Sequence, residues 1–155
     1  METRRLKNER LPIELLLLAD EAVEAINKYI HNSDVYIIER GEKIIGVYVL
    51  QKTDAISVEI KNIAVDEEFQ RQGIGKFLLQ DASRRAQEMG FKRIIVGTAD
   101  ASTQLLHFYQ KEGFEMFDIK RNFFIDNYPK PLYENGVQLK DMIMFKKELT
   151  VESQS

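Results

Sequence analysis

Apolar residues in the middle of the chain follow first a strand pattern and then a helix pattern. Residues 57–65 favour a strand, whereas residues 75–89 favour an amphipathic helix because their apolar positions recur at helical spacing. The apolar stripe of that helix contains Ile74, Leu78, Ala82 and Ala86, with Phe77 and Met89 beside it. Gly90 is a typical helix stop, and Arg84 and Arg85 are expected on the solvated or partly solvated side. We therefore expect a strand and a helix joined by a polar loop.

The N-terminal third is expected to contain both element types. The pattern predicts a strand within 3–7, two helices within 11–30, and hairpin strands at 35–39 and 44–51. Pro12 suits a first helical turn, and Asp20 is a candidate cap for the second helix. Gly41 marks the turn of the hairpin. Antiparallel strands of this kind supply one half of a sheet.

The C-terminal third has the same mixture of elements. The pattern predicts a strand at 91–98, a helix ending at 112, and strands at 114–124 and 141–149. Asp100 or Ser102 can cap the helix, and Gly113 ends it. The connection 125–140 contains the turn-forming residues Pro129, Pro131, Asn135 and Gly136, together with Tyr128 and Tyr133.

The strand at 57–65 changes its apolar parity halfway along. Val58 and Ile60 lie on one face, whereas Ile63 and Val65 lie on the other. A bulge near residues 61–62 produces such a shift, because one extra residue reverses the faces of all that follow. A regular strand buried on both faces toward its end gives the same pattern. Parity alone leaves both interpretations open.

The composition is that of one compact domain without covalent or metal cross-links. The chain has 155 residues, of which 44% are hydrophobic, so it can bury a core of its own. We expect a single domain over 1–155, with its core at 3–149 and a frayed tail at 150–155. There is no cysteine, and His31 and His107 are not spaced as metal ligands. We expect no metal.

Charge and hydropathy exclude some partners. The N-terminus lacks the apolar segment of a signal peptide, and no apolar run approaches the length of about 20 residues that spans a bilayer. The sequence has 22 Lys and Arg against 25 Asp and Glu, a formal net charge of −3. We therefore expect a cytoplasmic protein with neither a nucleic-acid nor a membrane partner, and a surface that suits cationic ligands.

The polar loop before the central helix is a candidate anion cradle. It reads Gln70, Arg71, Gln72, Gly73, Ile74, Gly75 and Lys76. Closely spaced glycines let a ligand approach the backbone, and the first N–H groups of a helix have no partner within the helix. An ordinary surface turn that starts a helix has the same glycines. The loop alone therefore leaves a binding site and a structural turn open.

Two familiar glycine motifs do not fit this loop. A P-loop places Ser or Thr after Gly-Lys to hold magnesium, but here Phe77 follows. A dinucleotide fingerprint begins with a glycine directly after the strand, whereas the polar run 66–72 intervenes here and Leu78 stands at the third glycine position. Nucleotide binding is therefore weakly supported.

Two segments together resemble the GNAT superfamily of N-acetyltransferases. Residues 70–75 match the acetyl-CoA motif Gln/Arg-x-x-Gly-x-Gly/Ala, and residues 108–114 are similar to the family segment Phe-Tyr-x-Lys-x-Gly-Phe. The resemblance covers roughly residues 57–117. It implies an α/β (α+β) fold of the GNAT-like acyl-CoA N-acyltransferase type, with a mixed, mostly antiparallel twisted sheet of six to seven strands and about four flanking helices. It favours the bulge in the strand at 57–65, since that strand splays from its neighbour in the family.

The same resemblance implies an activity and its residues. Acetyl-CoA would be the cosubstrate, and a primary amine in a small molecule or peptide would be the acceptor. Glu59 would accept the amine proton through a water molecule, and Tyr109 would protonate the leaving thiolate. The backbone N–H groups of 71–76 would hold the pyrophosphate, while a backbone N–H near Val65 would stabilise the oxyanion. The expected cofactor-binding residues are Ile63, Ala64, Val65, Gln70, Arg71, Gln72, Gly73, Ile74, Gly75, Lys76, Ser102 and Phe108.

Several features of the site stay open at this point. Many relatives have asparagine where this chain has Ser102, and serine cannot replace both the donor and the acceptor of an amide. Acidic residues of the first two helices could frame a cationic pocket or form a solvated face; they are Glu14, Asp20, Glu21 and Glu24. The connection 125–140 borders the acceptor site in relatives, or it is only a long hairpin loop. A homodimer and a non-catalytic acyl-CoA sensor are further alternatives.

Overall fold

The computed structural model describes residues 1–149, so the tail expected at 150–155 lies outside the described residues. In chain order the elements are β1 (Arg4–Arg5), α1 (Ile13–Leu16), α2 (Val23–Asn27), β2 (Asp34–Arg40), β3 (Lys43–Lys52), β4 (Ser57–Val65), α3 (Ile74–Glu88), β5 (Arg93–Ala99), α4 (Thr103–Lys111), β6 (Glu115–Lys120), α5 (Phe123–Asn127), β7 (Tyr133–Glu134), β8 (Val137–Gln138) and β9 (Met142–Glu148). Short 3₁₀ turns lie at Ile30–Asn32 and Glu67–Phe69.

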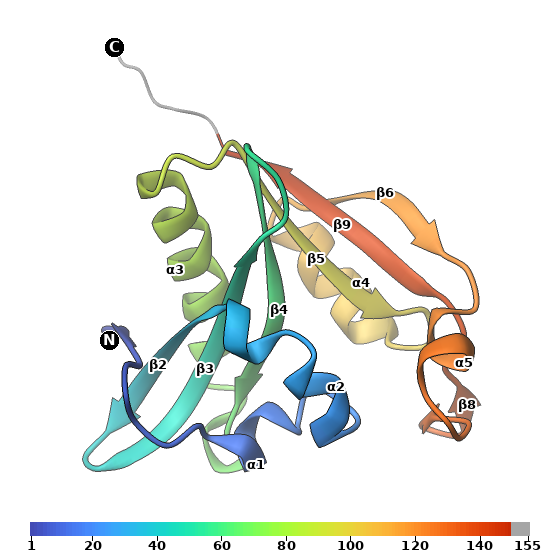
Figure 1. The fold of residues 1–155 in the computed structure, drawn as a ribbon, viewed down its shortest axis with the longest axis horizontal. Coiled ribbons are helices and arrows are strands. Elements are labelled where there is room, and N and C mark those ends of the chain that lie inside the picture. The colour runs from blue at the N-terminus through green and yellow to red at the C-terminus, as the bar shows by residue number, and fades with distance from the viewer. Residues whose placement is uncertain (150–155) are drawn as a thin grey trace.

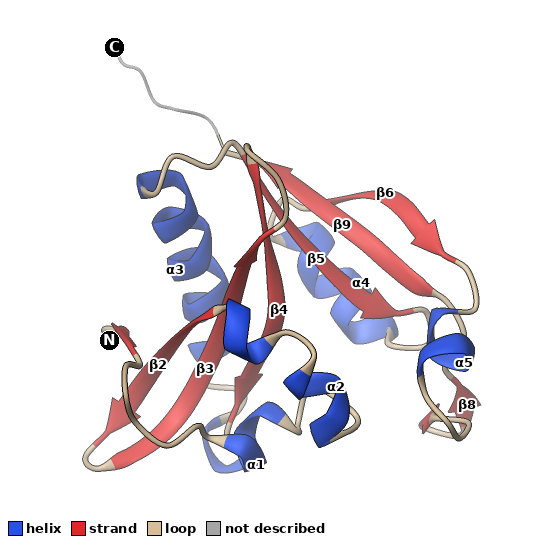
Figure 2. Ribbon diagram, in the orientation of Figure 1, coloured by secondary structure: helices blue, strands red, loops and turns tan. Residues whose placement is uncertain are grey.

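Seven strands form one twisted sheet in the order β1-β2-β3-β4-β5-β9-β6 (Figure 1). Only β4 and β5 run parallel, and every other neighbouring pair in this sheet is antiparallel. Helices α3 and α4 cover one face, and α1 and α2 cover the other (Figure 2). The expected mixed, mostly antiparallel sheet flanked by helices is confirmed.

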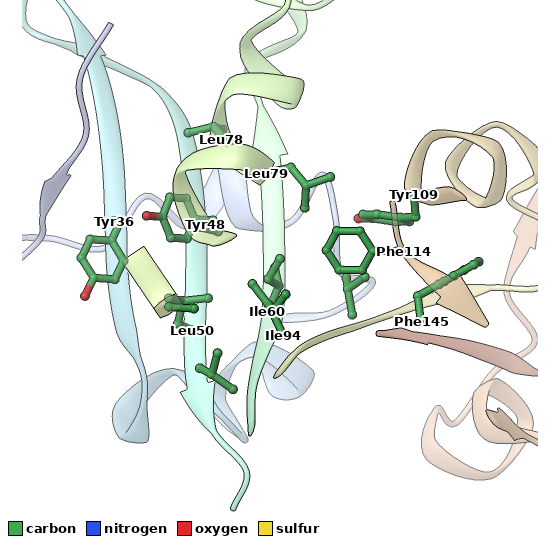
Figure 3. Close-up of a cluster of buried hydrophobic side chains, with 14 of the residues drawn as sticks. Tyr36, Tyr48, Leu50, Ile60, Leu78, Leu79, Ile94, Tyr109, Phe114 and Phe145 are labelled. Atoms are coloured by element: carbon green, nitrogen blue, oxygen red, sulfur yellow. The ribbon is translucent and has the colours of Figure 1, made fainter. Parts of the chain in front are cut away.

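Each face of the sheet carries its own apolar core, because side chains alternate along the strands. In β3, Tyr48 and Leu50 pack under α3, while Val47 and Val49 pack under α1 and α2. Figure 3 shows the first core, where Tyr109, Phe114 and Phe145 meet leucines of α3. The central strands are therefore buried on both faces, and the face to which a side chain points decides which of the two cores it joins.

The parity shift of β4 comes from a bulge. Ile60 pairs with Leu50 of β3, and Asn62 pairs with the adjacent Val49, so Lys61 is the extra residue on β4. The bulge turns Ile63 and Val65 toward the same core as Ile60, and turns Ala64 toward the other core. The bulge expected near residues 61–62 is confirmed.

The last third of the chain corrects one expected strand. Strand β6 ends at Lys120, and residues 123–127 form the helix α5 where a strand was expected to continue to 124. Asn122 has a left-handed backbone (φ 55°), and its N–H donates to the Asp141 carboxylate (2.9 Å). Asparagine tolerates this conformation, and no apolar pattern reveals it in advance.

One expected helix cap is wrong. Helix α2 begins after Ala22 and not after Asp20, whereas α4 begins after Ser102 as expected, although the Ser102 side chain accepts no hydrogen bond from the helix. The Asp20 and Ser102 side chains are instead engaged with distant residues, and the Asp100 carboxylate accepts from the Lys140 backbone N–H (3.2 Å). Local propensity is overridden by tertiary hydrogen bonds at all three positions.

A buried polar network fixes α3 to the sheet. The Asp81 carboxylate accepts from the Tyr48 hydroxyl (2.7 Å), the Thr3 hydroxyl (2.6 Å) and Arg84 (2.6 Å). Arg85 donates to the Tyr48 and Thr3 hydroxyls at 3.0 and 2.8 Å. Arg85 lies on a partly solvated side of α3, as expected, with its side chain 25% exposed, and it also links α3 to Tyr48 of β3 and to Thr3.

The charge of Asp81 is stabilised within this network. Burial raises the pKa of Asp81, but hydrogen bonds from Thr3, Tyr48 and Arg84 outweigh it, and the net pKa is lowered. A lowered folded-state pKa means that the carboxylate contributes its full stability above the pKa of a free aspartate, about 3.9. That contribution is lost only as the pH falls through the lower folded-state value.

Asp81→Ala is expected to lower the free energy of unfolding by about 3 kcal/mol at neutral pH, because buried donors lose their shared acceptor. Urea denaturation measures the change. Glu88→Ala is the matched control, since Glu88 also accepts from Arg84 but its side chain is 61% exposed, against 5% for Asp81. The control should change stability by less than about 0.5 kcal/mol. Equal losses in both variants would show that the network does not stabilise α3.

Candidate active site

Strands β4 and β5 begin as neighbours and then separate. Residues 57–60 of β4 pair with residues 93–96 of β5, and the ladder ends there. The rest of β5 pairs only with β9, while the rest of β4 pairs only with β3. Figure 1 shows the two strands diverging toward the carboxyl end of the sheet. Residues 61–65 therefore have a strand neighbour on one side only.

The free side of β4 presents the backbone of Ile63 and Val65. The Asp66 N–H donates to the Ile45 carbonyl (2.8 Å), and hydrogen-bonded pairs alternate along an antiparallel ladder. The backbone groups of Ala64 therefore point to β3, whereas those of Ile63 and Val65 point toward β5. Of the three residues expected to align a cofactor, Ile63 and Val65 offer backbone groups, and Ala64 does not.

The loop after β4 starts α3 with an open set of N–H groups. Arg71 (φ 65°) and Gly73 (φ 84°) both have left-handed backbones, and Gly73 is the N-cap residue. Within residues 1–149, the N–H groups of 71–76 make no hydrogen bond to a backbone carbonyl; the Phe77 N–H is the first to donate, to the Gly73 carbonyl (3.0 Å). The first turn of α3 contains no acidic residue. This arrangement suits an anion.

Side chains around the loop support the same role. Arg71, Gln72 and Lys76 are exposed, and two of them add positive charge to the helix start. The Gln70 side chain donates to the Val65 carbonyl (2.9 Å), which ties the loop to the end of β4. Gln70 therefore positions the loop, while the backbone N–H groups remain available.

Tyr109 projects from α4 into the core beneath the parted strands. Its side chain is 3% exposed, and its ring packs against Phe114 and Phe145 (centroids 5.8 and 5.9 Å apart), as Figure 3 shows. Burial raises the pKa of the Tyr109 hydroxyl, so the phenol stays protonated at neutral pH. Its hydroxyl makes no hydrogen bond to a side chain or carbonyl of the described residues. The proton is therefore available to a ligand.

Glu59 lies on the other face of the sheet from Tyr109. Its neighbours Val58 and Ile60 face α3, so the Glu59 side chain faces the α1 and α2 side. Its side chain is only 14% exposed, and its carboxylate is 3.7 Å from the Lys61 Nζ. The expected base and acid thus approach the region where β4 and β5 separate from opposite faces.

Phe108 and Ser102, both expected to contact the cofactor, differ in whether their side chains are free to do so. Phe108 is partly buried and lines a pocket of about 540 Å³ with Thr103, Gln104, His107 and Lys111. Ser102 is buried, and its hydroxyl donates to the Glu134 carboxylate (2.7 Å). A cofactor contact from Ser102 would have to share this hydroxyl, whereas Phe108 borders open space.

One set of residues could not be assigned from the sequence. Asp20, which precedes α2, accepts hydrogen bonds from the hydroxyls of Tyr29 (3.1 Å) and Tyr128 (2.8 Å), and Asn62 of β4 donates to the Tyr29 hydroxyl (3.1 Å). Tyr128 lies 108 residues from Asp20 in the sequence. The only available signal was the chemical type of these residues, because nothing in a local pattern brings them together.

Residues 1–149 contain no group of three or more His, Cys, Asp or Glu side chains arranged to hold a metal ion. Over the same range, no helix has the length and apolar character needed to cross a membrane.

Comparisons with known proteins agree with this fold. The model of the acetyltransferase (GNAT) family matches residues 4–114. The chain is 41% identical over 130 residues to the uncharacterized N-acetyltransferase YvbK of Bacillus subtilis, covering 84% of each. It therefore belongs to the GNAT family of acetyltransferases, and the expected fold and enzyme class are confirmed.

Solved structures agree closely with the chain. A GNAT family acetyltransferase from Elizabethkingia anophelis with acetyl-CoA bound has a TM-score of 0.93 and 44% identity, over 96% of this chain and 97% of that one. A Bacillus subtilis acetyltransferase in complex with CoA has a TM-score of 0.86 and 38% identity, over 96% and 100% of the two chains. An IAA acetyltransferase from Bacillus cereus has a TM-score of 0.90 and 40% identity, over 96% and 99%.

Proposed function

We propose that the protein transfers an acetyl group from acetyl-CoA directly to a primary amine. The observation that carries this proposal is the separation of β4 from β5 next to the unpaired N–H groups at the start of α3. A strand with free backbone groups suits an extended amide chain such as pantetheine, and a helix start suits a pyrophosphate. The relatives solved with acetyl-CoA and with CoA support this choice of cosubstrate.

The cosubstrate contacts follow from the backbone. The N–H groups of residues 71–76 hold the pyrophosphate, and the charges of Arg71 and Lys76 add to the attraction. Ile63 and Val65 align the pantetheine through strand-like hydrogen bonds, while a backbone N–H near Val65 stabilises the developing oxyanion. Phe108, the further expected contact, lines a pocket formed by residues of α4. Ser102 keeps its bond to Glu134 and contributes at most a shared contact.

The two titratable residues divide the proton transfers. An alkylammonium has a pKa of about 10.4, so Glu59 accepts its proton through water before the nitrogen attacks the thioester carbon. A C–N bond forms, the C–S bond breaks, and the nitrogen loses its second proton to solvent. Tyr109 gives its proton to the departing thiolate and regains one from solvent, since burial keeps the phenol protonated. The net products are the amide, free CoA thiol and one proton. The chain has no cysteine, so an acyl-cysteine intermediate is excluded.

Gly73→Ala is expected to weaken CoA binding at least about tenfold, because a side chain disfavours the left-handed backbone that aims the loop N–H groups. Isothermal calorimetry with CoA measures the affinity. Gly90→Ala is the matched control: its φ is 92° against 84° for Gly73, and neither site has a heavy atom within 4 Å of the added carbon. Both variants should lose similar stability, but only Gly73→Ala should lose affinity. Equal affinities would remove the loop from the cosubstrate site.

Tyr109→Phe should lower kcat about a hundredfold with little change in the Kd of acetyl-CoA, because it removes the proton donor and keeps the ring contacts. Thiol release from acetyl-CoA in the presence of a panel of primary amines, followed by mass spectrometry of the products, measures this and tests the function itself. Tyr133→Phe is the control, since Tyr133 is 63% exposed. Wild-type turnover in Tyr109→Phe would exclude the acid role. Tight acetyl-CoA binding without thiol release from any amine would favour the sensor.

Glu59→Gln should change the pH dependence of the rate. Without a base, the enzyme depends on the small fraction of acceptor that is already neutral, and that fraction rises about tenfold per pH unit below its pKa. We expect the variant to recover activity steeply from pH 7 to 9, whereas the wild type levels off. Steady-state kcat/KM profiles measure this. Parallel profiles for the two proteins would identify Glu59 as a bystander.

A further inference from the structure

Two distant segments meet beside the parted strands on the face opposite α3. The loop before α2 supplies Asp20, and the segment after α5 supplies Tyr128, whose hydroxyl donates to the Asp20 carboxylate (2.8 Å). In Figure 1, α2 lies in front of the sheet and α5 lies beyond the end of β5, so they flank the divergence of β4 and β5. The hydrogen bond joins the two flanks into one wall.

That wall is connected to the bulge of β4 through buried groups. The Tyr29 hydroxyl donates to Asp20 (3.1 Å) and accepts from the Asn62 Nδ2 (3.1 Å). Asn62 is 4% exposed, and its Oδ1 has no hydrogen-bond partner in the described part of the chain. An unpaired buried acceptor next to this network is the kind of group that a ligand donor satisfies.

The wall carries three carboxylates. Glu21 follows Asp20, and Glu134 arrives from β7, held by the Ser102 hydroxyl (2.7 Å). Burial raises the pKa of Glu21, and the negative charges of Asp20 and Glu134 raise it further. Among residues 1–149, none of these three carboxylates forms an ion pair with a lysine or arginine. Other carboxylates of the chain do form such pairs, at the surface. A bound cation would relieve this repulsion.

On the same face of the sheet, a primary alkylammonium of the protein itself already lies beside Glu59, namely the side chain of Lys61. Lys61, the bulge residue, places its Nζ 3.7 Å from the Glu59 carboxylate and 5.6 Å from the centre of the Tyr29 ring. A carboxylate and an aromatic face are the two groups that favour an ammonium. The environment of Glu59 therefore fits the head group of an aliphatic amine, between the bulge and the acidic wall.

We propose that the acceptor is an aliphatic primary amine carrying a second positive charge and no nearby carboxylate. Asp20, Glu21 and Glu134 bind the distal cation while the reacting amine lies by Glu59. An acceptor with a carboxylate at the distal end meets like charges in a partly desolvated site and is rejected. The inference rests on the N-acetyltransferase function proposed above and names its substrate class.

Three amines of equal length test this selectivity. Putrescine carries a distal ammonium, 4-aminobutanol a neutral hydroxyl, and 4-aminobutanoate a carboxylate. Thiol release from acetyl-CoA gives kcat/KM for each with the full-length protein. We expect putrescine to exceed the alcohol at least about tenfold and the carboxylate by more, with the preference shrinking as salt is added.

Glu21→Gln tests the wall directly, because no side-chain hydrogen bond of Glu21 is needed for the fold. It should lower the putrescine-to-aminobutanol ratio at least about threefold through KM, leaving the Kd of acetyl-CoA and the thermal midpoint unchanged. Glu24→Gln is the matched control: both glutamates are exposed, but only Glu21 lies beside Asp20 and Glu134, so the change at Glu24 should leave the ratio unchanged.

The outcomes separate this inference from the function on which it rests. Equal turnover of the three amines, or a preference for the carboxylate, would overturn the cationic acceptor and leave acetyl transfer intact. An unchanged ratio in Glu21→Gln would remove the wall from recognition. If acetyl-CoA binds and no amine releases thiol, the transferase function itself fails, and the inference fails with it.

Discussion

The bulge at Lys61 is the constraint on which the site depends. In a regular parallel pair, the backbone groups of β4 that face β5 would be hydrogen-bonded to β5 along the whole strand. One extra residue bends β4 away after Ile60, so the ladder with β5 stops while the ladder with β3 continues. The free groups of Ile63 and Val65 and the N–H groups at the start of α3 then face the same region. A single inserted residue therefore frees the strand-like part of the proposed cosubstrate site, and the glycine loop at the start of α3 supplies the other part.

The bulge also decides which face each reacting group occupies. Before it, Glu59 faces the α1 and α2 side, and after it Asn62 and Ala64 face that side as well. The side chains of Ile63 and Val65 therefore join the core that contains Tyr109. The acid side of the reaction is thus lined by apolar side chains, while the base side lies toward the carboxylates of Asp20, Glu21 and Glu134. This division suits a thiolate leaving on one face and a cationic amine entering on the other.

The sequence predicted those parts of the molecule that local chemistry determines. Strand β4 was predicted with its observed bounds and α3 within one residue at each end, because apolar periodicity and glycine spacing are local signals. The role of the glycine loop between them as a cradle stays a prediction. Helix α5 was missed, because it depends on the left-handed Asn122 and its bond to Asp141. The cap assigned to Asp20 was wrong, and Ser102, although it is the N-cap residue of α4, does not cap the helix with its side chain. Their side chains bind Tyr128 and Glu134, which no short-range pattern places nearby.

The proposed anion site at the N-terminus of α3 requires that this helix be held in a fixed position on the sheet. A helix start can hold an anion only if it stays in place, and the exposed loop at 70–73 supplies little packing. The anchor therefore lies farther along the helix. Leu78 packs closely over Gly46 of β3, where a side chain would meet it at 3.0 Å, and Asp81 joins the helix to Tyr48 of the same strand. Apolar contact sets the distance of α3 from the sheet, and the directional bonds of Asp81 set its rotation. Because β3 also pairs with β4, the same strand positions both the helix start and the free backbone of Ile63 and Val65.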